Sequence, residues 1–429
     1  MEFVIILLVL AGVAITIGVI WYIQRQRYIQ AFESLGWTFV NTPSIEIAHG
    51  LNMPPFGLGF DRRVDEQVIG TTSRGVPFQA FEYKASNYSL GGFVVAMPLG
   101  HSMPEYHLVP TPRERNGSMT LIVQESPTHR TLSTVPEFGH AVDSVIGPLL
   151  GGFPAGTVVD LSIDHDQLVA HGAPTDAAGL QPFVEALGPI ATALNAAPLS
   201  SFVGPERPVE LGWYNRPDWI YRVRDDGMLQ SVNHTGGGSN HEATNVIFCN
   251  TAPLPFVRLT HKWTTTRTVT ESDGDGGTRT RTVTDHHSEE IFEYHPTFPF
   301  RDFKVNAGWF GGRRTFESED FNEQFTVRAS DPRFAHDIFH PRMMEYLMAT
   351  RPAPFVHDGQ GRLTIDLSGN TASIEAATDF LLGFFARVPN YVWENLGLFT
   401  PPLPLYHAVD EGVRTALEQV QQQRMPYRQ

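Results

Sequence analysis

The stretch that decides the fold is SDPRFAHDIFHPRMMEYL, Ser330 to Leu347, and a second version of it stands at VPEFGHAVDSVIGPLL, Val135 to Leu150. Each contains the pattern Pro-x-Phe-x-His with an apolar residue two positions later. The matching residues are Pro136, Phe138, His140 and Val142 in one stretch and Pro332, Phe334, His336 and Ile338 in the other. Proline is favoured just inside a helix start, and apolar residues follow at helical spacing. We therefore predict a helix in each stretch.

The flanks of the two stretches agree at a nearly constant offset. Each stretch is followed by a short hairpin with a turn, at residues 164–166 and at 358–361, and then by a helix with one apolar face. Each is preceded by a strand, a proline-rich turn and another strand. Pro136 and Pro332 are 196 positions apart. That period predicts two tandem modules rather than a solenoid of short repeats.

The predicted fold class is α+β. We expect an N-terminal transmembrane helix followed by two tandem antiparallel-sheet modules, each with a mid-module helix and a C-terminal helix. By analogy this order also fits a PH-like arrangement. The expected domains are 1–24 (transmembrane anchor), 25–60 (juxtamembrane helix and irregular linker), 61–200 (first module), 201–399 (second module) and 400–429 (proline linker and C-terminal helix).

Composition narrows the class of protein. The chain of 429 residues has 46 acidic and 31 basic residues, a net charge of −15, which disfavours broad binding of nucleic acids because that depends on neutralising phosphates. Cys249 is the single cysteine, so no intramolecular disulfide can form. It lies in the apolar run NVIFCN, where a buried, inert thiol is expected.

The first residues predict a membrane anchor. Residues 3–23 are 21 residues without a charge, and about 20 apolar residues span a bilayer core. A cleaved signal peptide is disfavoured because no basic residue precedes the run. Lysine occurs only at Lys84, Lys262 and Lys304 and all other basic residues are arginine, which is typical of a GC-rich bacterial genome, so a bacterial plasma membrane is expected. Arg25 and Arg27 follow the run, and by the positive-inside rule they predict that the modules lie in the cytoplasm. Ala14 and Gly18 form a small-xxx-small pair that would allow a homo-oligomer.

A long hairpin is expected at residues 264–284. Two threonine-rich alternating runs flank the glycine-rich residues 273–277, and both faces are polar. An exposed, projecting hairpin is the first interpretation, and a protein-binding arm is the second. Its basic residues are Arg267, Arg279 and Arg281.

Few residues suggest chemistry. His336 and His340 are four apart on the predicted helix, a spacing that can present two metal ligands, but the other copy has His140 with Ser144. We expect surface or capping roles for both, and no metal site. The histidine clusters at 164–166 and 286–287 are assigned to turns. No catalytic or cofactor-binding residue is predicted.

Several segments resemble one group of proteins. GWTFV (36–40), the run from PPFGLGF to QAFEY (54–83) and ESEDFNEQFTVRASDPRFAHDIFHPRMMEYL (317–347) are similar to uncharacterised actinobacterial single-pass membrane proteins that carry a bacterial domain of unknown function. The 135–150 copy departs from that domain's pattern. The resemblance implies a membrane protein and brings no catalytic residues with it.

Three functions stay open at this point. The first is a membrane-anchored, non-enzymatic binding or scaffolding protein, with a groove between two related sheets. The second is a membrane-anchored hydrolase or metal-dependent enzyme with an unrecognised site. The third is a structural membrane protein that self-associates through its span.

Overall fold

A computed structural model of the chain describes residues 2–86, 88, 91–111, 120–272, 278–308, 316–366 and 374–403. The side chains of residues 2–9, 14 and 272 are outside this description. The chain divides into two compact units, residues 1–223 and 224–429. The predicted hairpin tip at 273–277 and the predicted C-terminal helix lie outside the described residues.

The first unit begins with a long helix and then builds a sheet. Its elements are α1 (Glu2–Glu33), β1 (Thr38–Val40), η1 (Ile45–Ala48), β2 (Arg63–Thr71), β3 (Pro77–Lys84), β4 (Phe93–Pro98), β5 (Tyr106–Pro110), β6 (Leu121–Glu125), β7 (His129–Ser133), α2 (Pro136–Ile146), η2 (Gly147–Gly152), β8 (Leu161–Asp164), β9 (Gln167–Ala173), α3 (Ala177–Ala196), β10 (Gly212–Trp213) and β11 (Arg216–Arg224).

The second unit contains the remaining elements. They are η3 (Asp226–Ser231), β12 (Ser239–Cys249), β13 (Phe256–Ser272), β14 (Thr278–Tyr294), β15 (Phe303–Ala307), α4 (Glu319–Gln324), β16 (Phe325–Arg328), α5 (Pro332–Ile338), α6 (Pro341–Thr350), β17 (Phe355–His357), β18 (Leu363–Ile365), α7 (Ile374–Ala386) and α8 (Asn390–Asn395).

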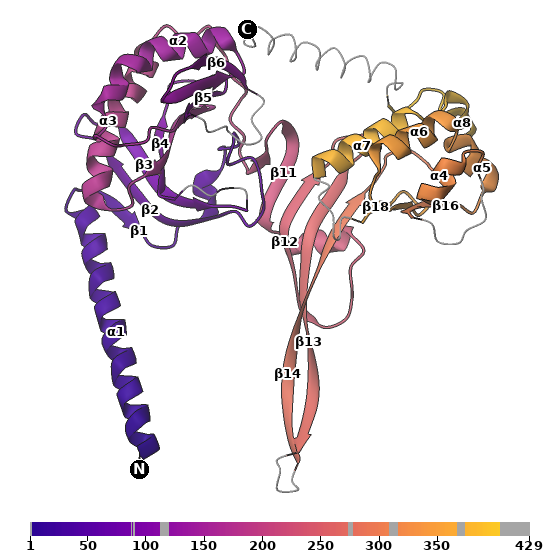
Figure 1. The fold of residues 1–429 in the computed structure, drawn as a ribbon, viewed down its shortest axis with the longest axis horizontal. Helices are drawn as coiled ribbons and strands as arrows, with labels where there is room; N and C mark the ends of the chain where they lie inside the picture. The colour runs from indigo at the N-terminus through magenta and orange to yellow at the C-terminus, as the bar shows by residue number, and fades with distance from the viewer. Residues whose placement is uncertain are drawn as a thin grey trace. The chain divides into compact units, whose positions relative to one another are not determined.

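The α+β class with two antiparallel sheets is confirmed. The nine-stranded sheets have the orders β1-β2-β3-β4-β9-β8-β5-β7-β6 and β10-β11-β12-β13-β14-β18-β17-β15-β16. In both sheets, two strands that are consecutive in the sequence (β4 and β5, β14 and β15) are separated by a hairpin that comes after them in the chain (β8–β9, β17–β18). A helical segment precedes that hairpin and another helix follows it (Figure 1). This four-strand arrangement is what a duplication would produce, and the strands on either side of it differ in number between the two sheets.

In each unit the helix that follows the later hairpin, α3 or α7, buries an apolar face. In α3 the buried residues recur at helical spacing, with Leu180, Val184, Leu187, Ala191 and Leu194 among them. Asp176 caps the helix start by accepting a hydrogen bond from the Gly179 amide at 2.9 Å. The helix therefore lies on the core of the first unit, and α7 buries a similar face that includes Phe384 and Phe385.

The helix predicted over Ser330 to Leu347 is two helices, α5 and α6. Pro341 disfavours a helical conformation for the residue before it, and His340 is extended, with ψ 166°. Phe339 and His340 therefore separate the two helices. The prediction that His336 and His340 share one helix is wrong for this reason.

Residues 36–60, predicted as an irregular linker, are part of the first unit. Thr38–Val40 form β1, which pairs with β2. Leu51 and Phe56 are buried, with at most 1% of their surface exposed. Apolar side chains at these positions pack the segment against the core. The many glycine and proline residues of the segment had suggested an irregular linker instead.

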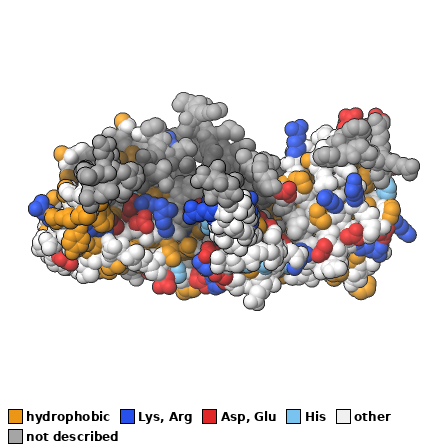
Figure 2. Space-filling model, turned by 90° about the horizontal axis from the view of Figure 1, so that it is seen from below, with side chains coloured by type: hydrophobic (Ala, Val, Ile, Leu, Met, Phe, Trp, Pro, Cys, Tyr) orange, Lys and Arg blue, Asp and Glu red, His pale blue; other side chains and the backbone are white. Residues whose placement is uncertain are grey.

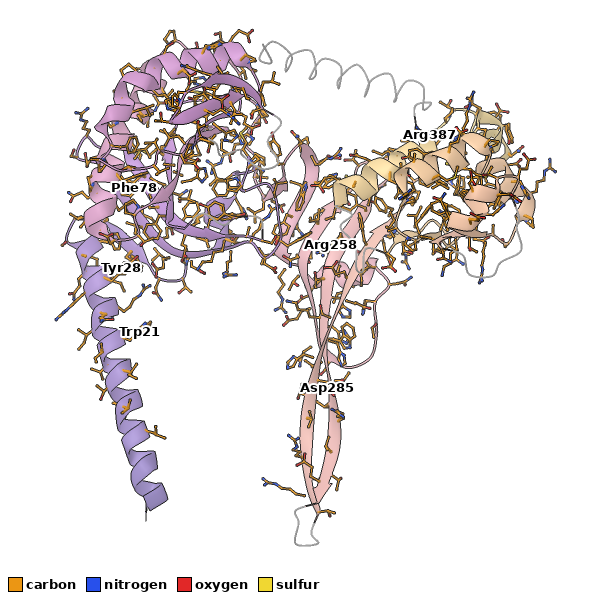
Figure 3. All side chains as sticks on the ribbon, in the orientation of Figure 1. Trp21, Tyr28, Phe78, Arg258, Asp285 and Arg387 are labelled. Atoms are coloured by element: carbon orange, nitrogen blue, oxygen red, sulfur yellow. The ribbon has the colours of Figure 1, made fainter. Side chains whose placement is uncertain are left out.

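Helix α1 has a packed part and an exposed part. Phe32 is fully buried, and the Tyr28 hydroxyl donates to the Glu66 carboxylate at 2.9 Å. Figure 3 labels Tyr28 and Trp21 on this helix. Farther toward the N-terminus, Ile15 and Trp21 are 68% and 66% exposed. As far as helix residues are described, none of the helices combines the length and the hydropathy that crossing a membrane requires. The predicted anchor at 3–23, part of which lies outside the described side chains, is thus not supported by the structure.

The predicted hairpin is confirmed and is longer than expected. β13 and β14 pair without a register shift from Phe256↔Tyr294 to Ser272↔Thr278. Figure 1 shows its distal part projecting from the second unit, and Figure 3 places Asp285 on it. Acidic and basic side chains are interspersed over the face of the molecule drawn in Figure 2. Cys249 is buried in β12, as predicted.

Candidate functional site

A cavity of about 510 Å³ opens in the first unit. Aromatic and aliphatic side chains form much of its wall: Met53, Val209, Leu211, Trp213, Tyr214 and Trp219. The two-residue turn between β10 and β11 places this wall, and Asn215 in that turn has a φ of 60°. Volumes of about 300–1,000 Å³ with mostly apolar linings and a few polar groups are typical of small-molecule sites.

A buried carboxylate, Glu105, forms one polar part of the lining. Glu105 precedes β5 and is 3% exposed. The hydroxyl of Tyr214 donates to its Oε2 at 2.7 Å, and its Oε1 lies 2.5 Å from Nε2 of His107. A buried carboxylate needs such partners, because desolvation disfavours the charged form. Tyr214 thereby links the aromatic wall to this carboxylate–histidine pair.

A second buried pair lies at the end of β8, where His165 lines the cavity and Nδ1 of His165 is 2.6 Å from Oδ1 of Asp164. The Met53 amide donates to Oδ2 of Asp164 at 3.0 Å. Burial raises the pKa of the Asp164 carboxyl, against the hydrogen bonds from His165 and the backbone. His165 has a φ of 57°, so the turn conformation itself presents this ring.

Arg62 supports the wall from behind. It is fully buried, with its guanidinium 5.1 Å from the Trp213 ring centroid and 4.1 Å from that of Tyr221. Its Nη1 donates to the Gly212 carbonyl at 2.8 Å. Burial lowers the pKa of this guanidinium. The stacking and the hydrogen bond fix β10 and the Trp213 ring in place.

The second unit contains a cluster of three histidines, His234, His241 and His261. One ring nitrogen of each lies within 4.8 Å of those of the other two. His234 lies in the loop before β12, His241 is near the start of β12 and His261 is in β13. His241 Nδ1 and His261 Nε2 are 2.8 Å apart, and His261 Nδ1 contacts Glu289 Oε1 at 2.8 Å.

The histidines predicted as weak metal candidates have other contacts. His340 precedes α6, and its Nε2 donates to the Arg387 carbonyl at 3.1 Å. The His336 ring packs on Phe316, with centroids 5.1 Å apart. Among the described residues, the histidine group that could hold a metal includes neither. His286 and His287, assigned to a turn, lie in β14 instead.

The cavity and the histidine cluster were both missed from the sequence, although each left a signal. The run LGWYNRPDWI, residues 211–220, has three large aromatic residues around a turn. Two of the clustered histidines, His234 and His241, come from the run HTGGGSNHE, and His261 comes from β13. They meet only when the chain folds. Spacings of seven and twenty residues match no local metal motif.

Comparison with known proteins gives little further information. No family model and no curated protein matches the chain. Among solved structures, the chain is similar to the mycobacterial trehalose monomycolate transport factor A, TtfA. The similarity covers 42% of this chain and 97% of that one, at 11% identity and a TM-score of 0.35. At these values no conclusion about fold or function is drawn from it.

Proposed function

We propose that this chain is a non-enzymatic binding protein, held at the cytoplasmic face of a bacterial plasma membrane. Its first unit takes a small molecule with an apolar body and a hydrogen-bond-donating end. The cavity beside Trp213 and Tyr214 is the observation that carries the proposal.

The shape and chemistry of the lining support this ligand class. Aromatic walls bind an apolar body through buried area and ring contacts. Three of the described lining residues are carboxylates, Glu105, Glu206 and Glu210, and one is a guanidinium, Arg216. Glu105 already accepts from Tyr214 and Glu210 from Arg222, and Glu206 is exposed beside them. Carboxylates accept hydrogen bonds and do not donate them when ionised. A neutral or cationic donor therefore suits the polar side of the cavity better than an anion does.

The cavity is tested by filling its mouth. Val209 is 87% exposed and lines the cavity, so Val209→Trp blocks the entrance without disturbing the core. The probe is N-phenyl-1-naphthylamine, a neutral apolar amine whose fluorescence rises on transfer out of water. We expect the purified wild-type chain to bind it and Val209→Trp to weaken binding by at least about tenfold, which is about 1.4 kcal/mol.

The matched control is Val203→Trp. Val203 is 78% exposed and does not line the cavity, so the same substitution there should leave binding unchanged. Equal affinities for Val209→Trp and wild type would remove the cavity as the binding site. Absence of wild-type binding would remove the ligand class.

The membrane part of the proposal rests on the sequence of residues 3–23 and on α1. That run carries no charge, and the exposed apolar side chains Leu10, Ile15 and Ile17 gather on one protruding helix. Contiguous exposed apolar surface of this kind marks an interaction site. Arg25 and Arg27 support the cytoplasmic side.

Fractionation of cells tests the attachment. We expect the full chain in the membrane fraction and a chain lacking residues 3–23 in the soluble fraction. If the full chain is found with soluble proteins, the attachment is wrong, and the cavity proposal remains to be judged by its own experiment.

A further inference from the structure

The histidine cluster of the second unit has the donor set of a transition-metal site. We propose that His234, His241 and His261 bind one divalent transition-metal ion, with Zn²⁺ as the reference ion, and that Glu289 orients two of these ligands. The site is separate from the cavity of the first unit and does not depend on the function proposed for it.

The distances suit a tetrahedral ion after a small adjustment. With Zn–N bonds of about 2.0–2.1 Å, ligand nitrogens stand about 3.4 Å apart. The three nitrogens are already within 4.8 Å of one another. His241 Nδ1 and His261 Nε2 are closer than the ideal, at 2.8 Å, because a hydrogen now joins them. An ion between the rings would take the place of that hydrogen, and the pair would separate by about half an ångström.

The hydrogen bonds around the rings assign their tautomers. Nδ1 of His261 faces the Glu289 carboxylate, which only accepts, so the hydrogen is on Nδ1 and the lone pair is on Nε2. Nδ1 of His234 lies 3.0 Å from the Thr235 carbonyl, which places the lone pair of His234 on Nε2 as well. His241 alone must move its hydrogen from Nδ1 to Nε2 to bind the ion. Neutral imidazole with its other nitrogen hydrogen-bonded is the usual form of a metal ligand.

Glu289 connects the ligands that come from different parts of the unit. It stands directly across from His261 in the β13–β14 pair. Its Oε1 accepts from the Thr235 amide at 2.9 Å and its Oε2 from the Thr235 hydroxyl at 3.1 Å. One carboxylate thus holds the His234 loop and the His261 ring. Carboxylates behind metal-bound histidines typically act in this way.

The backbone aims the third ligand. The register of β12 against β13 shifts between Ser239 and Glu242, and Asn240 has a φ of 55°. Such irregularities bend a strand and redirect a side chain. His261 is buried whereas His234 and His241 are partly exposed, so an ion can enter from solvent. Three protein ligands leave a fourth position for water or another small ligand.

The experiment is a calorimetric titration of Zn²⁺ into the full chain, purified without a histidine tag. We expect one ion per chain. His234→Ala and His241→Ala should each weaken binding by at least about a hundredfold, because a site with two histidines is a poor one. Glu289→Gln should weaken it by about 10–100-fold while keeping the side-chain size, since it acts only through the ligands.

His286→Ala is the matched control. It removes an exposed histidine from the same hairpin that is not in the cluster, and the affinity should not change. Because His234 and His241 are only partly buried, both variants should keep the wild-type circular dichroism spectrum. No binding by wild type, or equal binding by His241→Ala and wild type, overturns the proposal. Equal binding by Glu289→Gln overturns the orienting role.

Discussion

The two sheets share a central four-strand order, β4-β9-β8-β5 in one and β14-β18-β17-β15 in the other, yet the side chains buried behind them differ. The first unit buries two carboxylate–histidine pairs, Glu105 with His107 and Asp164 with His165. The second unit buries a cluster of phenylalanine rings around Phe384, which lies 5.7 Å from Phe303 and 5.5 Å from Phe355 between centroids. The shared topology therefore depends on apolar residues at helical and strand spacing. It is compatible with buried carboxylate–histidine pairs in one unit and with phenylalanine rings in the other.

The difference is clearest at the ends of β8 and β17, the first strands of the hairpins β8–β9 and β17–β18. β8 ends at Asp164, whose carboxylate has a histidine and a backbone amide as partners. β17 ends at His357, whose ring centroid is 5.6 Å from that of Phe300 and 5.9 Å from that of Phe303. The carboxyl group in the first position is held by specific partners next to a cavity. The equivalent position in the second unit is held by ring packing and by a hydrogen bond from the Gly359 amide to Nδ1 of His357.

The largest expected effect is the loss of a central ring in the second unit. Phe384→Ala should lower the free energy of unfolding by about 3–5 kcal/mol, because a fully buried phenylalanine leaves a cavity. Denaturant unfolding measures the loss. Phe399→Ala is the control, since Phe399 is 92% exposed and should change stability little. Similar losses for both would show that the phenylalanine cluster is not the core described.

An intermediate effect concerns acid. Burial lowers the pKa of His357 below its usual 6.5. Below that pH the unfolded chain takes a proton that the folded chain refuses, so stability is present at neutral pH and is lost as pH falls. His357→Asn keeps an acceptor for the Gly359 amide and does not titrate. Between pH 7.5 and pH 5, the free energy of unfolding should therefore fall less steeply in this variant than in the wild type. An unchanged slope would place the acid sensitivity elsewhere.

The smallest effect is expected on the hairpin. Arg267 and Asp285 form an exposed cross-strand ion pair at 2.8 Å. Exposed pairs contribute little, so Arg267→Ala should change the unfolding free energy by about 0.5 kcal/mol or less. A loss as large as that of Phe384→Ala would mean that the hairpin is packed against something in solution.

The sequence predicted the repeated architecture because that architecture depends on periodicity. Proline positions, turn residues and apolar stripes at helical spacing are local signals, and the helices α2, α3 and α7 and the hairpins β8–β9 and β17–β18 formed where these signals predicted them. Two predictions were wrong because of individual residues. One residue restricts the backbone of its predecessor, and the others are buried by contacts that form only in the folded chain. Pro341 divides one expected helix into two, and buried Leu51 and Phe56 make an apparent linker part of a core.

The candidate sites could not be predicted in the same way, because their residues meet only after folding. Glu105 and Tyr214 are 109 positions apart, and Thr235 and Glu289 are 54 apart. Aromatic density around Trp213 was visible in the sequence, but no pattern says that it borders an empty volume. The membrane attachment, its orientation and the family resemblance stay predictions.

The projecting hairpin has a consequence for local opening. β12 accompanies β13 only as far as Thr264, and the described pairing of β14 with β18 involves only Glu293 and Tyr294. Beyond these points the described ladder is a two-stranded ribbon, a structure that is marginally stable in water. Amide protons near its tip should therefore exchange with deuterium far sooner than those near its base. The His261 amide stands close to the boundary, so a ligand that ties the three histidines together would slow exchange in the inner part of the ribbon and leave the outer part unchanged.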